Sequence, residues 1–254
     1  MLGRWTESVL SEVELARYFA HGRNVGVVLG GLGGVVDVDL DNTVAVAVAD
    51  LLLPDTLVSG RAASPRSHRW YLAGNVPAPR KYALHKRMAE RLKLEPGEAT
   101  LVELRSTGQL TMVPPSVHTV SGDRCFWHQG EILNIDTEVL AGLVLDVAVA
   151  ALLALNCPLG SRTWFAIHAA GYLNPHLGYE RAVAIVDAAS AAFDDEEHDE
   201  RMQAVRSVLR KPVDDDAPMM EDLVAAELER LAPGVLALIE RWCARDRRNA
   251  GGGR

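Results

Sequence analysis

Short β-branched runs alternate with turn residues in the first half of the chain, a pattern that is typical of strands. The expected strands span residues 25–29, 35–40, 56–59, 69–72, 100–104, 110–113 and 131–135. The glycines of 30–34 and the turn at 106–108 predict two hairpins, which pair the first strand with the second and the fifth with the sixth. Apolar residues at helical spacing predict an amphipathic helix over 7–19, and Asp41-Asn42 forms a helix cap before a second helix.

The pattern changes in the second half, where apolar residues recur at helical spacing. The expected helices span residues 139–156, 161–173, 178–193, 198–210 and 220–245. Together these patterns predict an α+β fold, with a mixed domain over 1–138, an all-helical accessory domain over 139–248 and a disordered tail over 249–254.

Composition narrows the class of protein. Only 3 of the 254 residues are cysteines and no C-x-x-C pair occurs, which fits a reducing cytosol, and the charged N-terminus lacks the apolar core of a signal peptide. The apolar run at 140–157 contains Asp146, so we expect a buried helix rather than a membrane span, and a cytoplasmic protein.

Charge is distributed unevenly along the chain. The net charge of −8 argues against a protein that coats nucleic acid over its whole surface. Residues 61–105, however, hold 10 basic and 4 acidic side chains. This segment indicates either a phosphate-rich partner held in one place or a solvated charged face.

A cluster of acids follows the first glycine turn, in the stretch VVDVDLD. Strand alternation puts Asp37, Asp39 and Asp41 on one face, where carboxylates so close together repel unless a cation neutralises them. Converging oxygen ligands suit Mg²⁺ or Mn²⁺, and two such ions can stabilise the attacking and the leaving oxygen of a phosphoryl displacement. An exposed strand end with solvated aspartates gives the same local pattern, and so does the D-x-D of a glycosyltransferase.

Two further segments carry candidate chemistry. Glu103 lies between apolar residues of an expected strand, and a buried carboxylate needs a metal or a partner. Arg105 lies two residues further along and would share a face of the strand with Glu103, so it could be that partner. His68, with Arg66 and Arg69 on either side, is well placed to contact a polyphosphate, although an ordinary surface histidine fits the segment as well.

Taken in order, these motifs resemble the primase-polymerase domain of the archaeo-eukaryotic primase superfamily, as found in plasmid, phage and bacterial replication proteins. The matching stretches are NVGVVLGGLGGVVDVDLD, SPRSHRWYL and VELRSTGQLTMVPPSVH, followed by Gly122 and Trp127. The resemblance implies an archaeo-eukaryotic primase-like, RRM-like catalytic core over the first domain. The stretches GSRTWFAIHAAGYL, YERAVAIVDAASAAF and DERMQAVRSVLR resemble the small helical domain that follows many such cores.

When the family's motifs are matched to this sequence residue by residue, the resemblance implies an active site that binds metal and nucleotide. The acids that hold two divalent ions, Mg²⁺ or Mn²⁺, and carry catalysis would be Asp37, Asp39 and Glu103. The nucleotide-binding residues would be His68 and its neighbours in sequence, together with the arginine after the third acid: Arg66, Ser67, His68, Arg69 and Arg105. Some relatives carry a zinc-binding insertion, but His118, Cys125 and His128 match it poorly, so we expect no structural zinc.

We therefore expect a template-dependent DNA primase or polymerase that acts on single-stranded DNA with NTPs or dNTPs. No G-x-x-x-x-G-K-[ST] motif occurs, so a helicase would be a separate partner, and no membrane is expected. Two alternatives stay open. A metal-dependent D-x-D glycosyltransferase would bind a nucleotide sugar without a template, and a non-catalytic replication-origin DNA-binding module would not need three acids.

Overall fold

The computed structural model describes residues 10–19, 22–128, 130–192, 196–210 and 217–251. Contacts group the chain into two compact units that interleave along the sequence. The sheet unit comprises residues 1–41, 54–81 and 102–141, and the helical unit comprises residues 42–53, 82–101 and 142–254. The consecutive domains expected over 1–138 and 139–248 stay a prediction.

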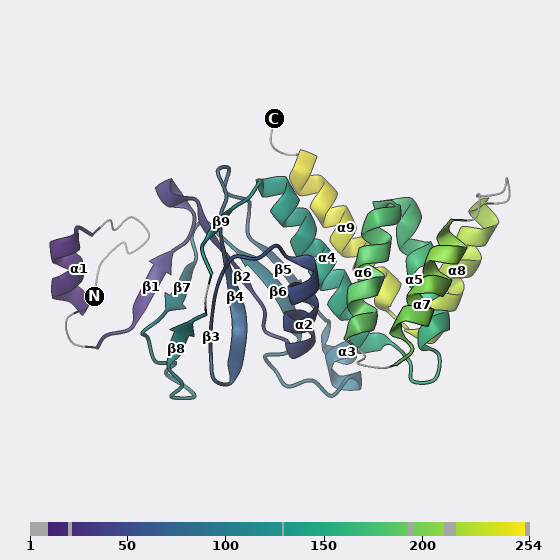
Figure 1. Ribbon diagram of the computed structural model, residues 1–254, viewed down its shortest axis with the longest axis horizontal. Helices are drawn as coiled ribbons and strands as arrows, with labels where there is room; N and C mark the ends of the chain where they lie inside the picture. The colour runs from purple at the N-terminus through teal and green to yellow at the C-terminus, as the bar shows by residue number, and fades with distance from the viewer. Residues whose placement is uncertain (1–9, 20–21, 129, 193–195, 211–216, 252–254) are drawn as a thin grey trace. The chain divides into compact units, whose positions relative to one another are not determined.

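Seven strands form the main sheet, in the order β5-β6-β2-β4-β3-β8, with β9 paired parallel to β4 (Figure 1). The strands are β2 (Val35–Asp39), β3 (Leu57–Arg61), β4 (Ser64–Leu72), β5 (Arg80–Ala83), β6 (Thr100–Arg105), β8 (Cys125–Trp127) and β9 (Leu133–Asn134). β2 lies between β4 and β6 and runs antiparallel to both. The mixed α+β class expected from the sequence is confirmed, because this sheet is accompanied by helices on the same chain.

A second, two-stranded sheet corrects the expected hairpins. β1 (Val25–Val28) pairs with β7 (Leu110–Val113), whereas β2 pairs with β6, so each expected hairpin has exchanged its partner. Both turns pass the chain from one sheet to the other. Gly30 has φ 74°, and a side chain there would place its Cβ 2.8 Å from the Cα of Thr107, so the two turns lie directly against each other.

The small sheet is tied to the main sheet by an apolar cluster. Leu29, Trp70 and Val113 are buried together, although they come from three distant segments of the chain. Trp70 lies on β4, and Val113 lies on β7. The cluster therefore fixes β1 and β7 against the main sheet of the sheet unit.

Helices make up most of the helical unit. They are α2 (Thr43–Leu52), α3 (Lys86–Arg91), α4 (Thr137–Asn156, whose first residues belong to the sheet unit), α5 (Arg162–Leu177), α6 (Tyr179–Ala191), α7 (His198–Leu209), α8 (Ala217–Leu231) and α9 (Val235–Gly251). The expected cap is confirmed at Asn42, whose side chain accepts hydrogen bonds from the backbone of Val44 (2.9 Å) and Ala45 (3.4 Å). In the sheet unit, α1 (Glu12–Phe19) forms within the helix expected over 7–19, of which residues 7–9 lie outside the described residues.

Two expected helix boundaries are wrong. The single helix expected over 220–245 is two helices, since Pro233 and Gly234 (φ 85°) separate α8 from α9. The helix expected to end at residue 173 continues as α5 to Leu177 with Pro175 inside it. Pro175 lies in the last turn of the helix, so the single backbone hydrogen bond that it removes is close to the helix end.

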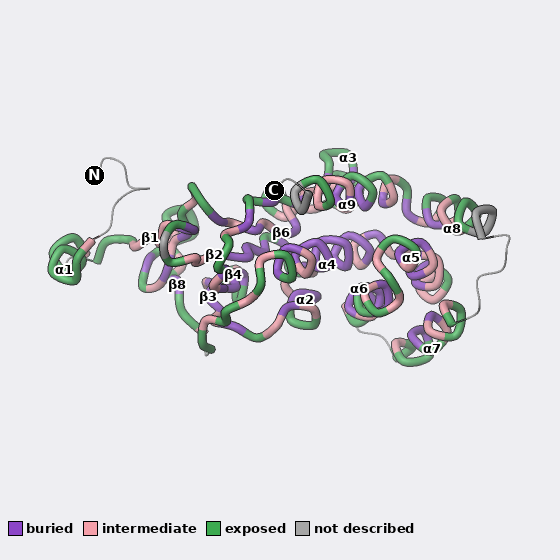
Figure 2. The backbone as a smooth tube through the Cα atoms, turned by 90° about the horizontal axis from the view of Figure 1, so that it is seen from above, coloured by how far each residue is buried: buried purple, intermediate pink, exposed green. Residues whose placement is uncertain are grey.

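The long apolar helix α4 is a core helix by its burial. Its length and composition would suffice to cross a membrane, but 67% of its most apolar window is buried within the protein, as Figure 2 illustrates. Asp146 is buried on this helix and forms two hydrogen bonds with Arg181 of α6, at 2.5 and 3.1 Å. The expected buried helix is therefore observed, and the charge inside it is neutralised by a bidentate partner.

Candidate active site

Strand β2 carries the two acids predicted as metal ligands. Asp37 and Asp39 alternate with Val36 and Val38, whose side chains are fully buried, so the acids share one face of the strand and the valines share the other. Asp39 lies directly opposite His68 on β4 and Glu103 on β6. Arg105 of β6 lies directly opposite Asp37. Directly opposed residues of antiparallel strands project from the same face, so five predicted site residues share it: Asp37, Asp39, His68, Glu103 and Arg105.

Asp37 is the more enclosed of the two acids. It is fully buried, and its Oδ2 accepts a hydrogen bond from Thr111 Oγ1 of β7 at 2.8 Å. Its second oxygen, Oδ1, is also buried and has no hydrogen-bond partner among the described residues. A buried carboxylate oxygen without a donor is costly, so this atom is a candidate ligand for a cation.

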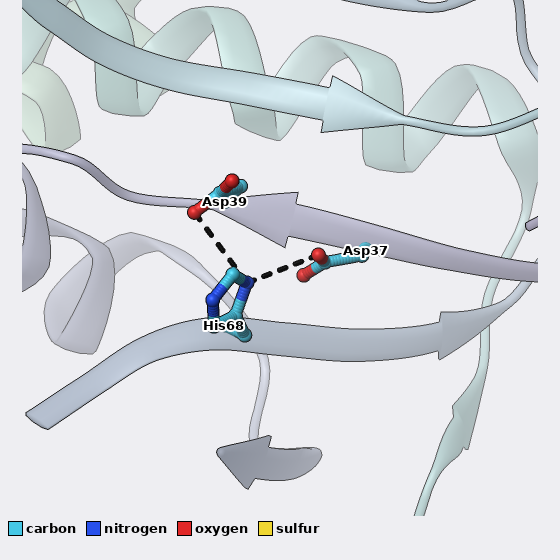
Figure 3. Close-up of side chains that lie close together, drawn as sticks. All are labelled: Asp37, Asp39 and His68. Carbon is cyan, nitrogen blue, oxygen red and sulfur yellow. Dashed lines mark hydrogen bonds and ion pairs between the residues drawn. The ribbon is translucent and has the colours of Figure 1, made fainter. Parts of the chain in front are cut away.

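His68 points between the two acids, as Figure 3 shows. Its Nδ1 lies 3.0 Å from Asp37 Oδ2 and 3.4 Å from Asp39 Oδ1. Burial alone would lower the pKa of His68, but the Asp37 and Asp39 carboxylates outweigh it and raise that pKa to about 9. His68 is therefore a cation at neutral pH in the absence of metal, and it balances the two acids.

Asp39 lies at the open side of the cluster. Its Oδ2 is 3.2 Å from Arg105 Nη1, so the arginine pairs with Asp39 and not with Glu103, the partner suggested by parity in the sequence. Burial raises the pKa of the Asp39 carboxyl above its usual range, protonated His68 opposes the rise, and Asp37 adds to it. The folded protein thus disfavours an unneutralised charge at this position.

One group of three side chains in the described part of the chain could hold a metal ion. Ligand atoms of Asp37, Asp39 and His68 all lie within 4.8 Å of one another. Two carboxylates and an imidazole are donors that Mg²⁺, Mn²⁺ and related ions accept, and the unpartnered Asp37 oxygen supplies a further lone pair. The residues present therefore fit a divalent cation.

Glu103 lies on the same face but outside this group. Its carboxylate pairs with Lys81 Nζ of β5 at 2.5 Å. Lys81 belongs to the basic segment noted in the sequence, but no local pattern indicated that it would meet the third acid. The assignment of Glu103 as a metal ligand stays a prediction, and in the metal-free state a lysine neutralises its charge.

The five predicted nucleotide-binding residues are divided between the two faces of the sheet. His68 and Arg105 share the face of the acids, whereas Arg69 lies opposite Val38 and Val58 and projects from the other face. The division follows from strand alternation, since neighbouring residues of β4 point to opposite faces.

Ser67 and Arg66 contribute mainly to the local structure of β4. Ser67 is buried, and its hydroxyl donates a hydrogen bond to the carbonyl of Ser64 at 3.0 Å. Arg66 has φ 59°, next to an irregularity in the pairing of β3 with β4. Arg66 and Arg69 both line a pocket of about 590 Å³ beside β9.

The sheet and its charged face define the class as an α+β protein with a candidate divalent-metal site. Comparison with known families identifies it further. The family model Prim-Pol, described as bifunctional DNA primase/polymerase, N-terminal, matches residues 3–141, more than half of the chain. The chain therefore belongs to this family of DNA primase/polymerase domains, which confirms the resemblance seen in its motifs. No curated protein and no solved structure matches the chain.

Proposed function

We propose that this protein is a template-dependent DNA primase/polymerase that transfers a nucleotidyl group from an NTP or dNTP to a 3′-hydroxyl on a single-stranded DNA template. The observation that carries the proposal is the cluster of Asp37, Asp39 and His68 on the central strands, with a buried and unpartnered carboxylate oxygen. Membership of the Prim-Pol family supports the same reaction class.

In this reaction a bond forms between the 3′-oxygen and the α-phosphorus, and the bond from that phosphorus to the β-phosphate bridging oxygen breaks. Pyrophosphate leaves, and the hydroxyl proton passes to solvent or a base. Two Mg²⁺ or Mn²⁺ ions held by Asp37, Asp39 and Glu103 would supply Lewis-acid stabilisation of the attacking and leaving oxygens.

The chain's own basic side chains have a separate task. Once a cation neutralises the acids, the side chains of His68, Arg105 and Lys81 are no longer needed to balance them. These three residues reach the face of the acids from three different strands. Their role in the proposal is to bind and orient the triphosphate on that face.

The test is incorporation of a labelled nucleotide on single-stranded DNA, with and without a primer, in Mg²⁺, Mn²⁺ or chelator. We expect metal-dependent incorporation that follows the template sequence. Incorporation without a template, or none under any of these conditions by the folded protein, would contradict the proposal. Parallel assays with ribo- and deoxyribonucleotides establish the sugar preference.

A further inference from the structure

A row of directly paired residues crosses five strands of the main sheet and passes through the candidate active site. From β6 to β8 the row is Glu103, Asp39, His68, Ser59 and Trp127, and each residue lies opposite the next. Directly opposed residues share a face of the sheet. Trp127 therefore projects from the face that carries the acids, at the strand that ends the sheet.

The row sets the distance between Trp127 and the site. Neighbouring strands lie about 4.8 Å apart, so the backbone of Trp127 is two strands, or about 10 Å, from that of His68. Ser59 stands between them, and its hydroxyl accepts a hydrogen bond from Trp70 Nε1 at 2.9 Å. The row thus has no charged group between His68 and Trp127, and a single nucleotide is long enough to bridge the gap.

Trp127 is held in place and still open to solvent. Its ring meets the buried Trp70 ring edge-on, with centroids 5.7 Å apart and planes at 64°. The residue nevertheless remains 43% exposed. An aromatic ring that packs against its neighbour along one edge and is otherwise exposed to solvent can stack with another flat apolar group.

We propose that Trp127 is a stacking surface for a nucleobase of the substrate that binds at the acids and His68. The inference rests on the proposed function, and it adds a binding residue on β8 to the candidate active site. Stacking accepts any base, because every base has a π-face. The base belongs either to the incoming nucleotide or to the DNA strand, and the two sources are separable by experiment.

The experiment compares ligands with and without a base on the full-length protein in Mg²⁺. One arm measures dATP against inorganic tripolyphosphate, and the other measures a short oligodeoxythymidylate against an abasic strand of equal length. Trp127→Leu removes the ring, and Trp127→Phe keeps a smaller one. Phe126→Leu is the matched control, because Phe126 is the neighbouring residue of β8, 38% exposed, and points to the opposite face.

We expect Trp127→Leu to weaken binding of the base-bearing ligand in one arm by about tenfold, with the base-free ligands unaffected. Trp127→Phe should retain most of the affinity, and Phe126→Leu should match wild type. The arm that responds identifies whether the base is that of the nucleotide or of the strand.

Three results would overturn the proposal: unchanged affinity for both base-bearing ligands, equal loss for ligands without a base, or equal losses in Trp127→Leu and Trp127→Phe. Both substitutions remove the indole from the contact with Trp70, so a defect that is only structural affects them alike. Binding is measured without turnover. A base-dependent loss in a protein that incorporates no nucleotide would therefore support the stacking role and contradict the polymerase function.

Discussion

At the scale of single residues, the acids differ in what neutralises them. Asp37 is fully buried and contacts Thr111 and His68, and Asp39 is 9% exposed and contacts His68 and Arg105. His68 is shared between the two acids, and Asp39 has Arg105 as a second cationic partner. A site of this kind exchanges a protein cation for a metal ion when the metal arrives.

Asp39→Asn should separate stability from activity. The raised pKa of Asp39 means that the fold favours a neutral group there, so in chelator the melting temperature should stay equal or rise. The increase in melting temperature on adding Mn²⁺ should disappear, and nucleotide incorporation should fall by about a hundredfold or more. Asp41→Asn is the control, since Asp41 is exposed and lies outside the group of three. Retained turnover by a folded Asp39→Asn protein would sink the metal assignment.

His68 makes the stability of the metal-free protein depend on pH. Its pKa is raised from 6.5 to about 9, so its contribution is complete below pH 6.5 and is lost as the pH rises through 9. The contribution is at most about 3 kcal/mol. Urea unfolding in chelator should show the difference between wild type and His68→Gln shrinking from about pH 6 to about pH 9.5. A constant difference would mean that His68 is not protonated against the acids.

At the scale of elements, the exchange of strand partners depends on the contact between two turns. Gly30→Ala should cost about 2–4 kcal/mol, because it adds left-handed strain and places a methyl group against the backbone of Thr107. Gly31→Ala is a matched control with φ 61° and nothing within 4 Å of the new Cβ, so it should cost only about 1 kcal/mol. Denaturant titration measures both values, and equal costs would contradict the close approach.

The sequence predicted most strands and helices, but not β5, α3 or β8, and not the pairing of the strands. The β-branched runs marked β1, β2, β6 and β7 correctly, since strand propensity and turn residues are local properties. Which strand pairs with which depends on contacts between distant residues, here those of Leu29, Trp70 and Val113, and no local signal encodes them. Pro233-Gly234, by contrast, is a local signal for the break between α8 and α9.

In the candidate site, too, local patterns were predicted from the sequence and contacts between distant residues were not. The alternation of Asp37 and Asp39 was predicted from the sequence. The separation of Arg69 from His68 onto opposite faces was not, because the expected strand began at Arg69 whereas β4 begins at Ser64. The pairing of Lys81 with Glu103 was not, because it requires the order of β5 and β6 in the sheet.

At the scale of the whole molecule, the interleaving of the two units bears on how the chain can be divided. A fragment ending at residue 140 would cut α4 near its start and remove the helices grouped with residues 42–53 and 82–101. We expect such a fragment to lose cooperative thermal unfolding, followed by circular dichroism, relative to the full chain. A cooperative melt with retained primer extension would instead establish residues 1–138 as an independent domain.

The alternation of valine and aspartate along β2 also favours one register of this strand over the alternatives. A slip of one residue in this strand would turn Asp37 and Asp39 toward the side that Val36 and Val38 fill. There the acids would lose their present contacts with Thr111, His68 and Arg105. Chains in the wrong register are therefore the ones that unfold most readily. Chains that stay folded have Asp37 and Asp39 on the same face as His68. The strand register that stabilises the fold is therefore also the register that assembles the candidate site.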